Sequence, residues 1–200
     1  MYWYSARIMW QPNIRFAYVT YTVLALSTWS CNGPDSAASA LHTTPYFSLA
    51  DFFSEEATKL QQSNPEIIKA VSKNSEQEEK KIQVADWRSE FALFIDADIN
   101  KPAWRNSYQV DRVGSSVIYT STDPTLRTKE IRVETSPTGT VEHIRITNQV
   151  SNMLYQTDEQ LDYYVDSLYR IEKRQQVRII GESHYTITGE WQKTLGSERP

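Results

Sequence analysis

The stretch 129–147, "KEIRVETSPTGTVEHIRIT", decides the fold of this chain. Its apolar residues alternate with polar ones, first at Ile131 and Val133 and then, beyond the turn "SPTGT", at Ile144 and Ile146. Because successive side chains of a strand point to opposite faces, this period of two gives each strand one apolar face and one polar face. The short turn makes the two strands antiparallel, and the polar face indicates a sheet that meets water on one side.

The same alternation continues on both sides of this hairpin. In 184–191, for example, Tyr185, Ile187 and Trp191 alternate with polar residues. Short polar connections such as "TDPTLRT" separate the segments. We therefore predict an antiparallel meander over about residues 106–191. The candidate strands are 106–113, 115–122, 129–136, 141–150, 153–158, 161–174 (with a break left open), 175–181 and 183–191.

Two amphipathic segments before the meander are predicted to be helices. The first, about 48–63, begins at Ser48, a good N-terminal cap, and ends at the dipeptide "NP". Its apolar stripe consists of Leu49, Phe52, Phe53, Ala57 and Leu60. The second, about 86–98, begins at Asp86 and stops before "NKP". Its apolar face consists of Trp87, Phe91, Phe94, Ile95 and Ile99.

The segment between these helices, residues 67–84, fits either a hairpin or a helix. The alternation in "IQV" at its end favours a hairpin that turns at "KNS". We expect an α+β fold in which two N-terminal amphipathic helices pack on one face of a curved antiparallel sheet of about six to eight strands.

Residues 15–31, "RFAYVTYTVLALSTWSC", begin with a positive charge, continue without any charge and end in the only cysteine. As a helix the uncharged run would reach only about 22 Å, which is short of the roughly 30 Å of a bilayer core. The arrangement resembles the signal peptide of a bacterial lipoprotein, on Leu26, Ser30 and Cys31, although Trp29 departs from the usual pattern before the cysteine. Relaxed patterns of this kind are common in the Bacteroidota. The resemblance implies cleavage before Cys31 and acylation of its thiol and new amino group.

The resemblance also implies an order of segments: a signal peptide (1–30), the lipidated Cys31 with a flexible tether (31–47), and a single α+β domain (48–200). Two or more acyl chains, palmitate among them, would anchor the chain to the membrane of the cell envelope, since one chain alone binds only reversibly. Surface export of Bacteroidota lipoproteins tends to use an acidic run after the cysteine. Asp35 is the only acid there, so the resemblance implies the periplasmic leaflet of the outer membrane. Another type of signal, an uncleaved anchor helix and an incidental cysteine in a cytosolic protein are the alternatives.

The composition excludes several classes of function. The chain has a formal net charge of -4, and the 19 basic and 25 acidic residues that follow the signal peptide would give -6. Such a chain lacks the basic footprint of nucleic-acid binding, so no nucleic-acid partner is expected. One cysteine and three histidines without ligand spacing predict no metal site. Isolated glycines predict no phosphate loop, and no cofactor is expected.

The pattern of acids and histidines predicts no catalytic residue and therefore a non-enzymatic protein. Asp96 and Asp98 stand two positions apart on a helix and do not share a face, which favours a solvated helix end over a catalytic pair. His143 and His184 fall on polar strand faces and are expected to be exposed, with pairing as the alternative if their strands are neighbours. A hydrolase that uses surface histidine and aspartate is the weakest hypothesis.

Four tyrosines, Tyr155, Tyr163, Tyr164 and Tyr169, crowd one short acidic span and form a candidate ligand or partner surface, unless they only cover the rim of the sheet. The leading hypothesis is a lipid-anchored binding or assembly accessory whose partner is an envelope protein or a small ligand. The alternative is a carrier of an apolar ligand in a cavity between helices and sheet, similar to lipid and lipoprotein carriers in general shape. Six aromatic residues would line that cavity or fill it: Phe52, Phe53, Trp87, Phe91, Phe94 and Trp191.

Overall fold

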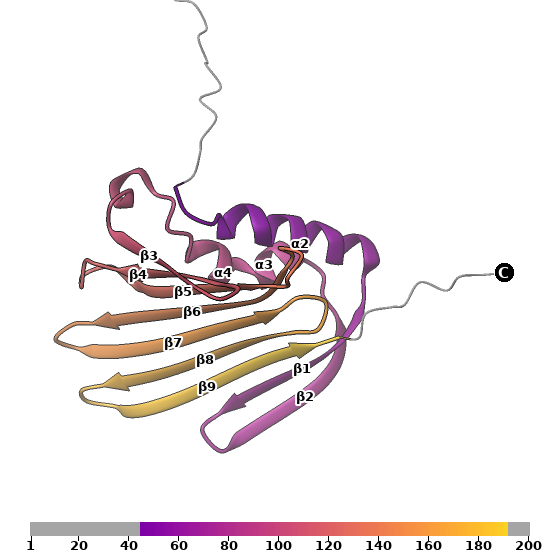
Figure 1. The fold of residues 1–200 in the computed structure, drawn as a ribbon. Coiled ribbons are helices and arrows are strands. Elements are labelled where there is room, and N and C mark those ends of the chain that lie inside the picture. Colours follow the sequence, from indigo (N-terminus) through magenta and orange to yellow (C-terminus); the bar gives the residue numbers. More distant parts are fainter. Residues whose placement is uncertain (1–44, 192–200) are drawn as a thin grey trace, which may run out of the picture. The chain divides into compact units, whose positions relative to one another are not determined.

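The computed structural model describes residues 45–191, which form an antiparallel sheet with helices on one face (Figure 1). The nine strands follow the order β2-β1-β9-β8-β7-β6-β5-β4-β3. The elements are α2 (Leu49–Ser63), β1 (Glu66–Lys73), β2 (Glu76–Gln83), α3 (Trp87–Glu90), α4 (Ala92–Asp96), the 3-10 helix η2 (Pro102–Trp104), β3 (Tyr108–Val113), β4 (Ser116–Ser121), β5 (Thr128–Thr135), β6 (Val141–Ser151), β7 (Tyr155–Tyr164), β8 (Leu168–Val177) and β9 (Gly181–Glu190).

Strands β3 to β9 pair in chain order, which confirms the predicted antiparallel meander. The β1–β2 hairpin, turned at Asn74 with a φ of 55°, is also confirmed and adds two strands beside β9. The sheet therefore has nine strands, more than the six to eight that the sequence predicted. This hairpin lies between α2 and α3, so the helices do not both precede the strands as expected.

The helices follow the predicted segments with one difference. Helix α2 begins after Ser48, whose Oγ accepts a hydrogen bond from the N–H of Asp51 at 3.1 Å, and ends at Asn64 in the left-handed conformation. Its buried residues are Leu49, Phe53, Ala57 and Leu60. The second predicted helix is divided at Phe91 into α3 and α4, and Asp86 caps its start by accepting hydrogen bonds from two backbone N–H groups.

The last three strands differ from the predicted boundaries. Strand β7 runs unbroken through Glu159, near which the sequence suggested a break. The turns that separate β7 from β8 and β8 from β9 lie at 165–167 and 178–180. Asp166 adopts a positive φ of 58° in the first turn, a conformation that the sequence pattern did not reveal because no glycine or proline marks it.

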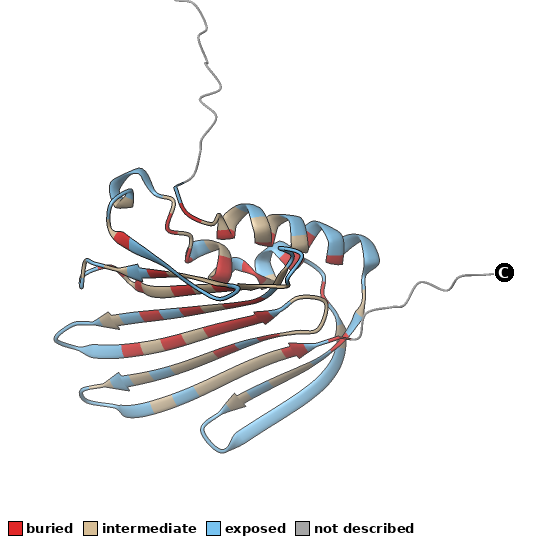
Figure 2. Ribbon diagram, in the orientation of Figure 1, coloured by how far each residue is buried: buried red, intermediate tan, exposed pale blue. Residues whose placement is uncertain are grey.

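The core lies between the helices and the sheet. The six aromatic residues expected there contact one another or Tyr163, with ring centroids 4.7 to 6.3 Å apart, and they fill the space beneath α2 and α3. Buried residues gather on the parts of the strands nearest the helices, whereas the turns β6–β7 and β8–β9 are exposed (Figure 2). We name the face with Ile144, Tyr163 and Tyr169 the helix-side face, and the opposite one the outer face.

Two tyrosine hydroxyl groups tie the helices to this face. Tyr163 on β7 donates a hydrogen bond to Glu56 of α2 at 2.5 Å. Tyr169 on β8 donates to Glu90 of α3, and the same carboxylate pairs with Lys69 of β1. Burial is the main cause that raises the pKa of both tyrosines, and the neighbouring carboxylate raises it further.

The part of the chain that bears on membrane anchoring lies mostly outside the structure. Cys31, the predicted signal peptide (1–30) and most of the predicted tether (31–47) fall outside the described residues and stay predictions. Among residues 45–191, no helix has the length and apolar character needed to cross a bilayer.

Candidate ligand-binding trough on the helix side of the sheet

Two adjoining hollows open on the helix-side face beyond the helices. The first, of about 300 Å3, has largely apolar walls: Leu93, Glu159, Ile171, Lys173, Gln175, Tyr185 and Ile187. The second, of about 200 Å3, is mainly polar: Arg127, Asn148, Gln149, Val150, Tyr155, Thr157, Glu159, Lys173 and Gln175. Because the hollows share Glu159, Lys173 and Gln175, we treat them as one site and name it the trough.

The strand register explains why these residues meet. Asn148, Glu159, Lys173 and Tyr185 stand opposite one another in one row across β6, β7, β8 and β9. Directly opposite residues of an antiparallel sheet share a face, so this polar row lies on the same face as the core. The neighbouring row contains Leu161, Ile171 and Ile187 and joins the trough to the core.

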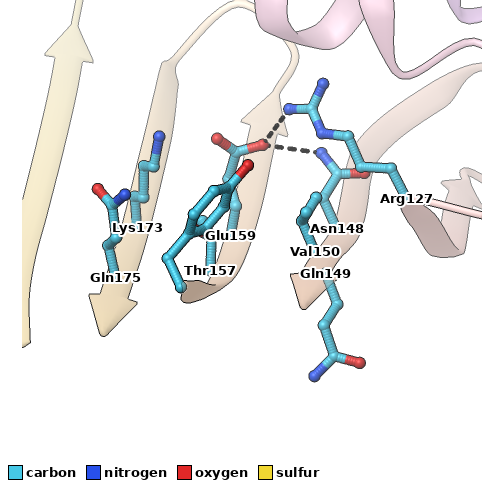
Figure 3. A pocket seen from close by; sticks show the side chains of 9 residues that line it. Arg127, Asn148, Gln149, Val150, Thr157, Glu159, Lys173 and Gln175 are labelled. Atoms are coloured by element: carbon cyan, nitrogen blue, oxygen red, sulfur yellow. Dashed lines mark hydrogen bonds and ion pairs between the residues drawn. The ribbon is translucent and has the colours of Figure 1, made fainter. Parts of the chain in front are cut away.

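The carboxylate of Glu159 is the centre of the polar end. Its side chain is 5% exposed and accepts hydrogen bonds from Arg127 Nη2 at 2.6 Å and Asn148 Nδ2 at 2.9 Å (Figure 3). The bond to Glu159 fixes the orientation of the Asn148 amide, because the opposite orientation would place two oxygens together. Asn148 Oδ1 is then buried without a hydrogen-bond partner among the residues that the structure describes. An unpaired buried acceptor costs about 1–3 kcal/mol.

Lys173 supplies a second unusual feature of the trough. It stands opposite Glu159 in the register, yet its ammonium makes no ion pair or hydrogen bond with any side chain of residues 45–191. Arg127 and Lys173 carry two positive charges against the one negative charge of Glu159. The polar end of the trough therefore favours an anion by simple charge balance.

A different cluster lies on the outer face around His143. The ring is buried, with Nε2 2.8 Å from Asp162 Oδ1 and Nδ1 3.3 Å from Glu134 Oε2, and it stacks on Tyr164 at 4.1 Å. Arg145 Nε donates to the same Asp162 oxygen at 2.7 Å. The expectation of an exposed His143 was therefore wrong, because Tyr164 covers its ring and two carboxylates engage its nitrogens.

Asp162 has a low pKa in this cluster. Burial of its carboxylate acts to raise the pKa, but hydrogen bonds from His143, Arg145 and Gln160 outweigh it and lower the pKa to about 2. The groups of the cluster satisfy one another, which indicates a structural charge network. His184 lies on β9, separated from the strand of His143 by β7 and β8, so the two histidines do not pair.

The four tyrosines predicted as one surface do not lie together. Tyr163 and Tyr169 are fully buried in the core, and for them the prediction of a ligand or partner surface was wrong. Tyr164 lies on the outer face against His143. Tyr155 alone of the four lines the trough, with 37% of its surface exposed. The reason is the strand period: residues one apart, such as 163 and 164, point to opposite faces.

The remaining candidates have structural positions. Asp98 accepts a hydrogen bond from the N–H of Ala50 in the first turn of α2 at 2.9 Å, while Asp96 is exposed. Within 45–191, no three histidine, cysteine, aspartate or glutamate side chains gather closely enough to hold a metal ion.

Sequence reasoning missed Asn148, Glu159 and Lys173, although a signal was present. Each stands in phase with core residues of its own strand, such as Ile146, Leu161 and Ile171, where an apolar side chain is expected. A polar residue in a core position indicates either a paired network or a binding site. No family model matches this chain, and no curated protein matches its sequence.

Proposed function

We propose that this chain is a non-enzymatic, lipid-anchored protein of the cell envelope that binds a small amphipathic anion in the trough. The observation that carries the proposal is the ammonium of Lys173, which has no partner among residues 45–191 and stands in a hollow also lined by Arg127 and by Asn148, whose buried Oδ1 lacks a partner among the same residues. Native proteins rarely leave a buried polar atom unsatisfied, so such an atom in a hollow suits a ligand that donates a hydrogen bond.

The polar end sets the head group of the ligand. An anionic group would pair with Lys173 and with the N–H groups of Arg127 that Glu159 does not use. A hydroxyl or N–H group beside that charge would donate to Asn148 Oδ1 only after a shift of the side chains that bury this atom. Glu159 accepts both hydrogen bonds on Oε2, so it holds Arg127 and Asn148 in place, and the charge of Arg127 offsets its own.

The apolar end sets the rest of the ligand. Leu93 of α4 and Ile171 and Ile187 of the sheet form a wall that continues from the core. A ring or short alkyl chain of the ligand would lie against this wall, and the site is at the small end of the range of ligand pockets, about 300–1,000 Å3. An amphipathic anion matches both ends together.

The carrier of an apolar ligand is the second candidate, favoured by one observation. The wall of Leu93, Ile171 and Ile187 offers apolar surface in a hollow beside α4, although the six aromatic residues expected to line the carrier's cavity pack against one another and leave none there. A purely apolar ligand, however, would leave Lys173 without a partner among residues 45–191. The two candidates therefore differ in whether Lys173 contributes to binding.

The anchoring part of the proposal rests on the sequence of residues 15–31 and its resemblance to lipoprotein signal peptides. The non-enzymatic part is supported by His143, whose buried ring has both nitrogens within hydrogen-bond distance of carboxylates of its own network and stacks on Tyr164. The partners of the protein would then be the membrane, through Cys31, and the ligand of the trough.

Two fluorescent probes of matched shape test this proposal. Anilinonaphthalene sulfonate is an amphipathic anion with an N–H group, and phenylnaphthylamine has the same rings and N–H group without the sulfonate. We expect Lys173→Gln to weaken binding of the anionic probe about tenfold, which corresponds to ~1.4 kcal/mol, and to leave the neutral probe unchanged. All titrations use the full chain, so that any probe bound by other segments contributes the same signal in every variant.

Lys81→Gln is the matched control, since it removes the same charge from an exposed position on β2, where the side chain is 69% exposed. It is expected to leave both probes unaffected. Equal effects of Lys173→Gln and Lys81→Gln on the anionic probe would rule out the amphipathic-anion site. Strong binding of the neutral probe, unchanged by Lys173→Gln and lost in Ile187→Ser, would instead support the apolar carrier.

A further inference from the structure

Four large aliphatic side chains stand exposed at two hairpin turns. In the β6–β7 turn, Met153 is 86% and Leu154 68% exposed; in the β8–β9 turn, Ile179 is 92% and Ile180 83% exposed. We name these four residues the tips. Single exposed apolar residues are common on protein surfaces, but a contiguous group indicates an interaction site.

The two turns are neighbours in space. The N–H of Arg178 donates to the carbonyl oxygen of Leu154 at 3.1 Å, and Tyr155 stands opposite Val177 in the β7–β8 pair. Both turns therefore project from the same end of the sheet, away from the helices (Figure 1). The tips form one convex, aliphatic projection from two adjacent hairpins.

The β6–β7 turn is well ordered by its own hydrogen bonds. Asn152 Oδ1 accepts from the N–H groups of Leu154 and Tyr155 at 2.9 and 3.0 Å, and the N–H of Asn152 donates to the carbonyl of Tyr155. These bonds satisfy backbone groups that would otherwise be costly to place in an apolar medium. The turn can thus present Met153 and Leu154 outward without depending on water for these groups.

The residues behind the tips are those of a membrane interface. Tyr155 is 37% exposed, and Arg178 is exposed and makes no ion pair with any described residue. The nearest acid on the second hairpin, Glu182, lies 3.4 Å from Arg174 and is balanced by it. Tyrosine and arginine are the residues that prefer the head-group level, with aliphatic side chains below them.

We infer that the tips insert into the interfacial layer of a lipid bilayer. A protein partner is disfavoured because a standard interface takes about 20–30 residues from each side, whereas the tips are four side chains on a narrow projection. The layered order of aliphatic, then aromatic and cationic, then polar residues matches the layers of a bilayer surface. The inference uses none of the trough residues that carry the ligand proposal except Tyr155, and it does not depend on acylation of Cys31.

Depth of insertion is the measurement that tests this inference. The full chain with Cys31→Ser is given one new cysteine, either Ile179→Cys or Val113→Cys, and labelled with an environment-sensitive fluorophore. Val113 is the matched control, because it is an apolar residue, 62% exposed, at the opposite end of the sheet. Both labelled chains are reconstituted in vesicles of phosphatidylethanolamine and phosphatidylglycerol, with or without nitroxide-bearing lipids.

We expect the fluorophore at position 179 to shift its emission to the blue with vesicles and to be quenched by nitroxide lipids at least about twofold more than the one at 113. Replacing the other tip residues, by Ile180→Ser and Leu154→Ser, is expected to reduce this quenching. Equal quenching at both positions would overturn the inference. A blue shift without lipid that grows with protein concentration would also overturn it and would assign the tips to contact with a second copy.

Discussion

The ring of Tyr169 lies against Gly189, its register partner on β9, so closely that a Cβ on residue 189 would be 2.5 Å from Tyr169 Cζ. A glycine inside a strand normally weakens it, and it often marks a place where another group must approach closely. Here that group is a buried tyrosine whose hydroxyl reaches Glu90 of α3. The absence of a side chain at Gly189 thus leaves room for the Tyr169 ring, whose hydroxyl joins α3 to the sheet.

Gly189→Ala is expected to lower the free energy of unfolding by about 1–3 kcal/mol, because the added methyl forces the Tyr169 ring to move. Denaturant titration measures the change. In the Tyr169→Leu background the same substitution should cost clearly less, since a smaller side chain leaves room for the methyl. An equal cost in both backgrounds would show that the ring contact is not the cause.

Tyr163→Phe is expected to cost about 1–3 kcal/mol of unfolding free energy, because it removes the donor to Glu56, whose side chain is 12% exposed. Tyr164→Phe is the control one residue along, on the outer face, where the ring stacks on His143. That control should change stability by less than about 0.5 kcal/mol. Similar losses in the two variants would contradict the role of the Tyr163 hydroxyl in holding α2.

Acid is expected to lower the free energy of unfolding by protonating Asp162. Its pKa in the folded chain, about 2, lies below the ordinary value of 3.8, so the folded state binds this proton less readily than the unfolded state. The contribution to stability, roughly 2 kcal/mol, is full above pH 3.8 and is lost as the pH falls toward 2. We expect the stability difference between wild type and Asp162→Asn to shrink over that window in denaturant titrations, whereas Asp96→Asn should follow the wild-type profile.

Arg127→Ala is expected to destabilise the chain by about 2 kcal/mol, because it leaves the buried carboxylate of Glu159 without its cation. Arg132→Ala removes a comparable cation from an exposed pair with Glu130, where the side chains are 37% and 36% exposed, and should cost less than about 1 kcal/mol. Thermal unfolding measures the loss of stability in both variants. Equal melting temperatures would show that the ion pair between Arg127 and Glu159 does not stabilise the fold.

The sequence predicted helices and strands correctly wherever the apolar residues recurred at an uninterrupted spacing. The stripe of α2, its Ser48 cap and the alternation of β5 and β6 lead directly to the observed elements, because burial of one face governs each of them. The β1–β2 hairpin followed from weaker alternation and turn chemistry. In these segments local pattern and tertiary packing agree.

The prediction failed where the helix-side face becomes polar. Glu159 and Lys173 interrupt the apolar phase of β7 and β8, so the sequence suggested breaks near these positions. The structure continues β7 through Glu159, whose charge is compensated by Arg127, distant in the chain, and it continues β8 through Lys173, which is paired in register on both sides by β7 and β9. Such a pairing depends on tertiary register, which no local pattern contains. The same residues form the trough, so the error of boundaries and the missed site have one cause.

His143 shows the second limit of the pattern. Its position on the polar phase of β6 was identified, but its burial was not, because burial depends on the cross-strand neighbours Tyr164 and Glu134. Alternation assigns a residue to a face and does not reveal what covers that face.

The composition of β2 has a consequence for sheet growth. This strand is the free edge of the sheet beside β1, and its sequence, "EQEEKKIQ", is exposed at every position except Ile82. An edge strand offers unpaired backbone groups to any other extended chain, and dense charge discourages such pairing. Five of its eight side chains carry charge. A further strand that paired with β2 would have to pack against these charges, so β2 discourages edge-to-edge aggregation of the protein.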